Sequence, residues 1–367
     1  MISKFRKILI LGLALVIVLS LSACTGSGSG SGSTPDTGSV PEVVPEEVFT
    51  LTYATGNGSE NGTYQNVEKV FLDKLQENSN GRIVIEEYIG GTLFASGQAF
   101  EGARKGSCDI AFDMTAAYAG QFPVTALLEQ SCAGPVTASS ACALINEFRE
   151  KYASGLPEYD GVEPLILMNA GPACLFGNKP IRAVGDIKGQ QIRTNATNNV
   201  AIEKLGGTPV IIGMNEVYDA FSTNTIDSGW FVPEAMYGFS LYEVANYGTV
   251  WPYNQSVILI VMNSDTFTSL PPDLQQIVKD TAKDVFENDV MGYFDSTFEE
   301  FLGMAAEKND KFEVIRLPQS DLDAVTEALW PFVEEYANKI EGEGHKGIEV
   351  MNWMQERAAY YNSQYPG

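Results

Sequence analysis

The chain has 367 residues, 44% of them apolar and 19% charged, which is enough for two lobes of ordinary size with buried cores. Its 47 Asp and Glu residues exceed its 23 Lys and Arg residues, so the net charge is −24 at pH 7. Such a negative field repels nucleic acid, and no run of basic residues offsets it. A single histidine, His345, excludes His-rich metal sites and most catalytic triads.

Residues 1–24 are typical of an export signal. They begin with basic residues, continue with the apolar stretch 8–21 and end at Leu21-Ser22-Ala23-Cys24. Small residues before a cysteine match a bacterial lipoprotein signal, in which the cysteine is acylated after cleavage. The apolar stretch is shorter than the roughly 20 residues of a transmembrane anchor, which is the alternative interpretation. We therefore predict a signal peptide over residues 1–23 and a lipid anchor on Cys24.

The segment 24–47 is predicted to be a flexible tether. Positions 25–47 contain five Gly, five Ser and three Pro, and they contain no Lys or Arg. A coil of this composition reaches roughly 25 Å, so a folded body can move beside the membrane while Cys24 stays anchored. The mature protein is thus predicted to be exported and held at the cell membrane, on the periplasmic or outer face of the cytoplasmic membrane.

Four further cysteines lie in the exported part, namely Cys108, Cys132, Cys142 and Cys174. Their even number is compatible with one or two disulfides, and a Cys132–Cys142 bridge is one alternative. The stretch around these two residues is rich in alanine and is typical of helix or core, which favours buried free thiols. The spacing holds no C-x-x-C pair, so neither a thiol catalyst nor structural zinc is predicted, and no cofactor is expected.

From Val48 onwards, segments in which every second residue is apolar alternate with segments in which every third or fourth residue is apolar. The first spacing is typical of strands and the second of helices, which indicates α/β layers. A β-α-β-α-β run is predicted first, and a second run of the same kind follows. The strands of the first run are expected at 49–53, 82–88 and 109–112, with helices near 67–75 and 98–105. The strands of the second run are expected at 191–193, 209–212 and 226–231, with helices at 198–205 and 215–223. Two similar α/β lobes are therefore predicted, with a ligand at the carboxyl ends of their strands.

A long helix is predicted after Pro271-Pro272, because apolar residues keep helical spacing from Leu274 to Ala305. Its length of about 50 Å would bridge both lobes, and Gly292 and Gly303 are candidate bends. A strand at 312–317 and helices near 321–340 and 347–361 follow. We expect lobe 1 to comprise residues 48–170 and 255–295, and lobe 2 to comprise residues 171–254 and 296–367.

The stretch Asp186-Ile187-Lys188-Gly189-Gln190-Gln191-Ile192-Arg193 resembles a run found in the solute receptors of tripartite ATP-independent periplasmic (TRAP) transporters, the DctP type. Segments 205–210, 215–221, 241–244 and 270–275 agree in order and spacing, and the resemblance covers essentially all of 48–362. It implies an α/β fold of the periplasmic-binding-protein-like class II type, with two mixed sheets flanked by helices. It also implies a non-enzymatic receptor that closes over a small organic acid and delivers it to an ion-gradient-driven membrane permease.

In that family the arginine at the end of this run clamps the ligand carboxylate, and the resemblance assigns this role to Arg193. The chemistry agrees, because a planar guanidinium offers paired donors to both carboxylate oxygens and stays protonated. An ordinary ion pair with a neighbouring carboxylate is the alternative for Arg193.

The sequence departs from the better-known acid-binding members near the expected site. Ala173 stands where some members carry a second arginine, and Trp230-Phe231 stands where many have asparagine. Fewer polar groups and more apolar surface favour an aromatic or apolar monocarboxylate over a C4-dicarboxylate or a sugar acid. The candidate ligand-binding residues are Arg193, Asn195, Met214, Trp230, Phe231, Met114, Thr115, and Asn57 in the loop Gly56-Asn57-Gly58. Each aromatic candidate could instead belong to the core.

Two other functions stay open from the sequence. The receptor of an ABC importer would share the fold and the export signal, and differs in the membrane subunits that it serves. A cell-surface carbohydrate hydrolase is the alternative from another class, because carboxylates distant in sequence can meet in a cleft. The identity of the acid, a co-bound cation and the oligomeric state are not specified by the sequence.

Overall fold

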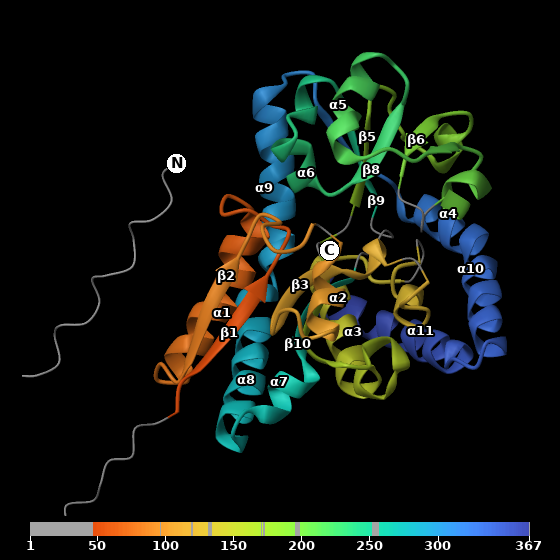
Figure 1. Ribbon diagram of the computed structural model, residues 1–367. Coiled ribbons are helices and arrows are strands. Elements are labelled where there is room, and N and C mark those ends of the chain that lie inside the picture. Colours follow the sequence, from red (N-terminus) through yellow and green to blue (C-terminus); the bar gives the residue numbers. More distant parts are fainter. Residues whose placement is uncertain are drawn as a thin grey trace, which may run out of the picture. The chain divides into compact units, whose positions relative to one another are not determined.

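The computed structural model describes residues 47–366, apart from Ser96, Ala119, 131–133, Ala170, Pro172, 195–198 and 252–256. Residues 46–367 form one compact unit (Figure 1). The predicted signal peptide, the lipid anchor Cys24 and the tether up to residue 46 lie outside the described residues. None of the described helices combines the length and the apolarity that a membrane span requires.

The first lobe is built on a five-stranded mixed sheet with the order β2-β1-β3-β10-β4. β1 pairs in parallel with β2 and β3, whereas β10 runs antiparallel between β3 and β4. The first three strands and the helices between them lie where the sequence predicted them. The strands and helices of this region are β1 (Phe49–Ala54), α1 (Lys69–Asn78), β2 (Ile83–Tyr88), α2 (Ala99–Arg104), β3 (Ile110–Met114), α3 (Ala138–Lys151), β4 (Val162–Asn169), β10 (Val257–Asn263) and α7 (Ser264–Ser269).

The second lobe is built on a six-stranded mixed sheet with the order β11-β9-β5-β8-β6-β7. β6 is parallel to β7 and β8, so these three strands end at the same edge of the sheet. The predicted fold class, two mixed sheets flanked by helices, is confirmed. The elements of this region are β5 (Ala173–Gly177), β6 (Gln191–Arg193), α4 (Asn199–Lys204), β7 (Thr208–Val210), α5 (Met214–Ser222), β8 (Ser228–Phe231), α6 (Pro233–Gly238), β9 (Tyr247–Trp251) and β11 (Glu313–Arg316).

The predicted single long helix is wrong, because the chain forms two helices separated by a break. α8 (Pro272–Val285) continues into a π-helical turn (Phe286–Val290), and α9 (Tyr293–Lys308) follows. Met291 between them is extended, with ψ 122°, and Gly292 has φ +83°, a left-handed conformation that glycine adopts readily. α8 packs on α1 and β4 of the first lobe, whereas α9 contacts α6 of the second lobe and α3 of the first.

The C-terminal helices differ from the predicted lobe division, which assigned residues 296–367 to lobe 2. α11 (Gly347–Gln364) packs on α3 of the first lobe and on α10. α10 (Gln319–Gly342) contacts the first lobe through the 3-10 turn Thr125–Leu127 and the second lobe through α4. The C-terminal segment therefore joins the lobes, and only β11 pairs within the second sheet.

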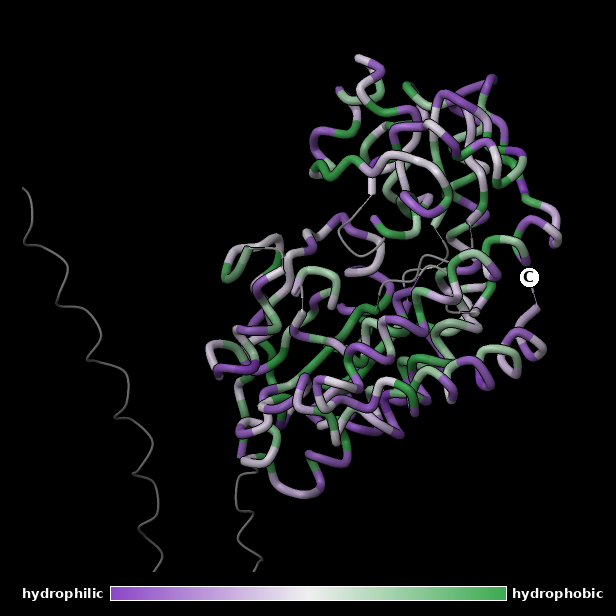
Figure 2. Tube along the Cα trace, turned by 90° about the vertical axis from the view of Figure 1, so that its right-hand side faces the viewer, coloured by the Kyte–Doolittle hydropathy of each residue, from purple (hydrophilic) through white to green (hydrophobic). Residues whose placement is uncertain are grey.

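The buried apolar residues form three clusters. One fills the space between the first sheet and the helices α1 and α8, and another lies in the second lobe around Phe176 and Phe221. The third includes Leu259 of the first sheet, Leu175 of the second, and Leu329 of α10. Figure 2 shows the apolar segments running through the interior of the chain. Because the third cluster contains residues of both lobes and of α10, the lobes and the C-terminal helices bury one another's apolar side chains.

The described cysteines confirm the favoured prediction of buried free thiols. Cys108, Cys142 and Cys174 are buried and free. Burial raises the pKa of the Cys108 and Cys142 thiols to about 12 and raises that of Cys174 as well. Thiols with such pKa values are protonated and unreactive at neutral pH. Cys132 itself lies outside the described residues.

Candidate ligand-binding site

Arg193 is the last residue of β6, and its guanidinium reaches the ends of the two neighbouring parallel strands. Its Nε donates a hydrogen bond to the carbonyl of Ile212, and its Nη1 donates to the carbonyl of Trp230, both at 3.2 Å. Burial lowers the pKa of Arg193, and no carboxylate in the described part of the chain opposes that shift. The alternative of an ordinary ion pair is therefore not formed among the described residues, and the guanidinium keeps donors for another acceptor.

Trp230 lies in β8, beside the position where β6 ends. It is 3% exposed and packs edge-to-face against Trp251, with ring centroids 5.6 Å apart and an interplanar angle of 74°. It belongs to the core cluster that both lobes share. Its indole Nε1 is buried and has no hydrogen-bond partner among the described residues.

Phe231, the next residue, is a core residue of the second lobe. Successive side chains of a strand point to opposite faces, so Phe231 and Trp230 enter different clusters. The Phe231 ring stacks on Phe176, with centroids 5.0 Å apart and an interplanar angle of 18°. Core packing accounts for Phe231 without a ligand, which is the alternative that the sequence left open. Met214, the first residue of α5, is half-buried against the same cluster.

The candidates in the first lobe have their polar groups occupied by the protein. The Thr115 hydroxyl hydrogen bonds to the Glu129 carboxylate and, at 3.0 Å, to the carbonyl of Val257. The Asn57 side chain donates to Glu68 Oε1 at 2.6 Å. Among the described residues, no hydrogen bond or ion pair joins either of them to Arg193.

Two further sequence candidates complete the set. Met114 ends β3 and is 36% exposed, which makes it one of the exposed large apolar side chains of the described chain. Asn195 lies outside the described residues, so its role stays a prediction. Ala173 begins β5 and pairs in register with Trp251.

The sequence analysis missed two buried carboxylates and one hydroxyl. Glu68 is fully buried and accepts a hydrogen bond from the Tyr53 hydroxyl, and burial raises the pKa of its carboxyl. Burial likewise raises the pKa of Glu129 to about 7. Thr194, directly after Arg193, is 1% exposed, and its Oγ1 has no partner among the described residues. Alternation along β6 places the Thr194 side chain on the same buried face of the sheet as Ile192. This alternation is visible in the sequence and could have identified Thr194 as a buried residue.

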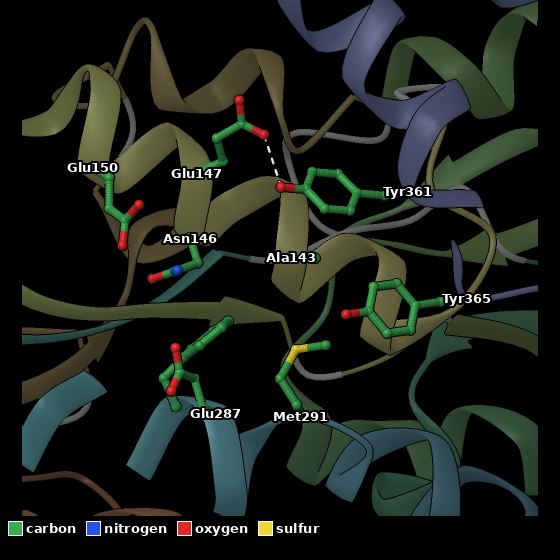
Figure 3. A pocket seen from close by; sticks show the side chains of 9 residues that line it. Ala143, Asn146, Glu147, Glu150, Glu287, Met291, Tyr361 and Tyr365 are labelled. Atoms are coloured by element: carbon green, nitrogen blue, oxygen red, sulfur yellow. Dashed lines mark hydrogen bonds between the residues drawn. The ribbon is translucent and has the colours of Figure 1, made fainter. Parts of the chain in front are cut away.

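A cavity of about 380 Å³ lies on the first lobe (Figure 3), and none of the candidate residues lines it. Its lining comes from α3, the π-helical turn before α9, and the end of α11. Three glutamates contribute to it, and Glu147 is already paired with Arg357 at 2.7 Å and with the Tyr361 hydroxyl. An acidic lining disfavours an anionic ligand, so this cavity is not the predicted carboxylate site. The lining residues are Ala143, Asn146, Glu147, Glu150, Phe286, Glu287, Met291, Tyr361 and Tyr365.

Residues 53–340 match the model of the family described as bacterial extracellular solute-binding protein, family 7, or DctP. The chain belongs to this family. The predicted resemblance to TRAP solute receptors is confirmed, and the family consists of binding proteins rather than enzymes.

Relatives of this family 7 protein agree with the assignment. The 2,3-diketo-L-gulonate-binding periplasmic protein YiaO of Escherichia coli is 26% identical over 219 residues, which are 59% of this chain and 66% of YiaO. The chain therefore spans slightly less than two thirds of that relative.

Two solved TRAP solute-binding proteins share the fold of the chain. One, from Rhodoferax ferrireducens, was solved with copurified benzoate and has a TM-score of 0.72 at 21% identity. The match covers 87% of this chain and all of the other. The second, from Bordetella bronchiseptica, was solved with bound (R)- and (S)-mandelate and has a TM-score of 0.71 at 19% identity. That match covers 85% of this chain and 99% of the other.

Proposed function

We propose that this family 7 protein is the lipid-anchored receptor of a TRAP transporter, and that it binds a monocarboxylate through Arg193. The observation that carries the proposal is the state of that guanidinium. It is half-buried, it contacts two backbone carbonyls, and no carboxylate among the described residues pairs with it. A partly desolvated cation of this kind is completed by an anionic ligand, and a planar carboxylate fits its paired donors.

The ligand is proposed to have an apolar or aromatic body and a single carboxylate. Ala173 supplies no second cation, so a second ligand carboxylate would be buried without a partner, at a cost of several kcal/mol. An apolar body gains roughly 25 cal/mol for each Å² that it buries, and Trp230 offers an aromatic neighbour. The benzoate and mandelate complexes of the two structural neighbours support this ligand class.

A thermal-shift panel of matched acids tests this proposal. Phenylacetate and branched-chain 2-oxo acids are compared with succinate and with sugar acids, and each hit is then titrated by calorimetry. We expect stabilisation by the monocarboxylates. Stabilisation by dicarboxylates or polyhydroxy acids alone would contradict the proposed ligand class. Mass spectrometry of ligand retained by gently purified protein identifies the natural acid directly.

Delivery of the acid to membrane permease subunits is part of the proposal, together with anchoring through Cys24. The variant Cys24→Ser removes the acylated sulfur and leaves the folded body unchanged. We expect the wild-type protein in the membrane fraction and Cys24→Ser in the soluble fraction of the envelope. Equal membrane association of the two proteins would show that Cys24 is not the anchor.

Ligand is further proposed to bring the two lobes together. The chain crosses between the sheets after β4 and after β9, and Met291-Gly292 interrupts the helical segment that contacts both lobes. Connections of this kind are suited to hinge closure. Small-angle scattering should record a smaller radius of gyration when a binding acid is added. An unchanged radius at saturation would contradict closure.

A further inference from the structure

Two residues next to Arg193, one in the chain and one in the neighbouring strand, each carry a polar atom that is buried without a hydrogen-bond partner among the described residues. The atoms are the hydroxyl Oγ1 of Thr194 and the indole Nε1 of Trp230, and their residues are 1% and 3% exposed. Buried polar atoms in proteins are almost always paired, because an unpaired one loses its bonds to water without replacement. A pair of such atoms therefore requires an explanation, and a ligand is one.

The two atoms belong to neighbouring residues on one face of the second sheet. β6 and β8 are parallel, with Ile192 opposite Ser228 and Arg193 opposite Gly229. One further step in this register puts Thr194 beside Trp230, and the backbone N–H of Thr194 extends the pairing to β7 by donating to the Val210 carbonyl at 3.1 Å. Side chains at matched positions of adjacent strands point to the same face, so Thr194 and Trp230 share one face. Arg193 starts on the opposite face, and its guanidinium reaches the carboxyl edge of the strands, where Nη1 donates to the Trp230 carbonyl.

Other buried hydroxyls of this sheet are satisfied within the protein. Ser228 donates to the side chain of Gln190, and Thr249 donates to the carbonyl of Ile181 at 2.9 Å. The two unpaired atoms, by contrast, belong to residues near the carboxyl edge of the strands, where Arg193 also donates to the Trp230 carbonyl. In open α/β sheets this edge is the usual place of a ligand. Asn199, whose Oδ1 is also buried without a partner among the described residues, begins α4 on the same edge.

We propose that Thr194 and Trp230 bind a second oxygen of the ligand, on the carbon next to the carboxylate held by Arg193. The receptor then selects 2-hydroxy and 2-oxo acids over the parent acids, an inference that rests on the proposed function. The indole N–H can only donate, so the ligand atom must accept a hydrogen bond. The threonine hydroxyl donates to an oxo group, or accepts from a ligand hydroxyl that the indole N–H also contacts.

Matched acids that differ only at this carbon test the proposal. The first set is 3-phenylpropionate, phenyllactate and phenylpyruvate, and the second set is propionate, lactate and pyruvate. Calorimetric titration of the full exported chain should give, in at least one set, about 10- to 100-fold tighter binding of the oxygenated acids. A site built for a polar oxygen discriminates strongly against an analogue that lacks it, because its own groups are then left unpaired.

Two variants connect this preference to the residues. Thr194→Val keeps the shape of the side chain and removes the hydroxyl, and Trp230→Phe removes the indole N–H. Each should reduce the preference for the oxygenated acids by about tenfold or more, because the oxygenated acids lose a hydrogen bond that the parent acids never make. Thr249→Val is the matched control, because its buried hydroxyl is already satisfied on the same face. It should leave the preference unchanged.

Thermal unfolding of the ligand-free proteins supplies a readout that is independent of ligand. Removal of an unpaired buried hydroxyl should leave the Tm of Thr194→Val unchanged or raise it. Removal of the paired hydroxyl should lower the Tm of Thr249→Val. A fall in Tm for both variants would show that Thr194 is satisfied within the protein, and this would overturn the proposal.

The remaining outcomes separate this inference from the proposed function. If wild-type protein binds oxygenated and parent acids equally, and Arg193→Met abolishes both, the selectivity proposal is wrong and the carboxylate clamp stands. If no acid of either set binds, or if Arg193→Met leaves binding intact, the carboxylate clamp fails and this inference fails with it.

Discussion

The candidate polar side chains of the two lobes differ in their hydrogen-bond partners. In the first lobe, the protein itself supplies partners for both candidates: Thr115 contacts Glu129 and Val257, and Asn57 contacts Glu68. At the edge of the second sheet, Thr194 and Trp230 have no partners among the described residues, and Arg193 has only carbonyls. The difference teaches that burial by itself does not mark a ligand site. The distinguishing property is burial combined with unused hydrogen-bonding capacity.

The largest expected effect comes from the cation of the second lobe. Arg193→Met should weaken binding of the correct acid by about 2–5 kcal/mol, or roughly one and a half to three and a half decades, because the ligand carboxylate is left unpaired. Arg193→Lys should recover part of the charge without the paired donors. Arg182, which is exposed and holds Glu313 through two bonds of 2.6 and 2.7 Å, is the control. Arg182→Met should bind normally, and calorimetry that shows equal affinity in all variants would refute the clamp.

Glu129 of the first lobe should act on stability through pH. Its folded-state pKa is about 7, raised from 4.5 by burial, so the folded protein binds this proton more tightly than the unfolded chain. Its stabilising contribution is complete below about pH 4.5 and is lost as the pH rises through about 7, a change of about 3 kcal/mol. Glu129→Gln stays neutral and should lack this part of the pH dependence. Denaturant unfolding at pH 5 and pH 8 measures it, and parallel profiles for the two proteins would contradict the assignment.

Thr115 and Thr194 offer a direct comparison of a paired and an unpaired hydroxyl. Thr115→Val removes a partner from the buried Glu129 carboxylate and should lower the free energy of unfolding by about 1–3 kcal/mol. Chemical denaturation measures this loss beside Thr194→Val, for which no loss is expected. Equal losses in the two variants would remove the distinction between the lobes.

The smallest effects concern two glycines that the sequence marked as bends. Gly292 has φ +83°, so Gly292→Ala should destabilise the protein by about 1 kcal/mol. Gly303 lies inside α9 with open space around its Cα, so Gly303→Ala should stabilise the protein by about 0.5–1 kcal/mol. Thermal unfolding of both variants checks the opposite signs. A change in Tm of the same sign in both variants would contradict the different backbone conformations assigned to Gly292 and Gly303.

The sequence by itself determined the local elements and the family. Apolar spacing located the β-α-β-α-β run of each lobe, from β1 to β3 and from β6 to β8, because a period of two or of three to four is a property of neighbouring residues. It gave no range for β4, β5, β9 or β10. The run that ends at Arg193 identified the family, and alanine-rich surroundings indicated that Cys142 is a buried thiol. Each of these conclusions depends on residues within a short stretch of chain.

Only the tertiary structure decided which side chains have partners and which lobe a helix joins. Phe231 was a site candidate until its stacking on Phe176 placed it in the core, and α11 was assigned to the second lobe although it packs on α3. The helix broke at Met291-Gly292, where periodicity continued without interruption. Thr115 and Thr194 both follow a strand. They differ because the Thr115 hydroxyl contacts Glu129 and Val257, whereas the Thr194 hydroxyl has no partner among the described residues. Hydrogen-bond satisfaction depends on residues far apart in the sequence, so it is established only when the chain has folded.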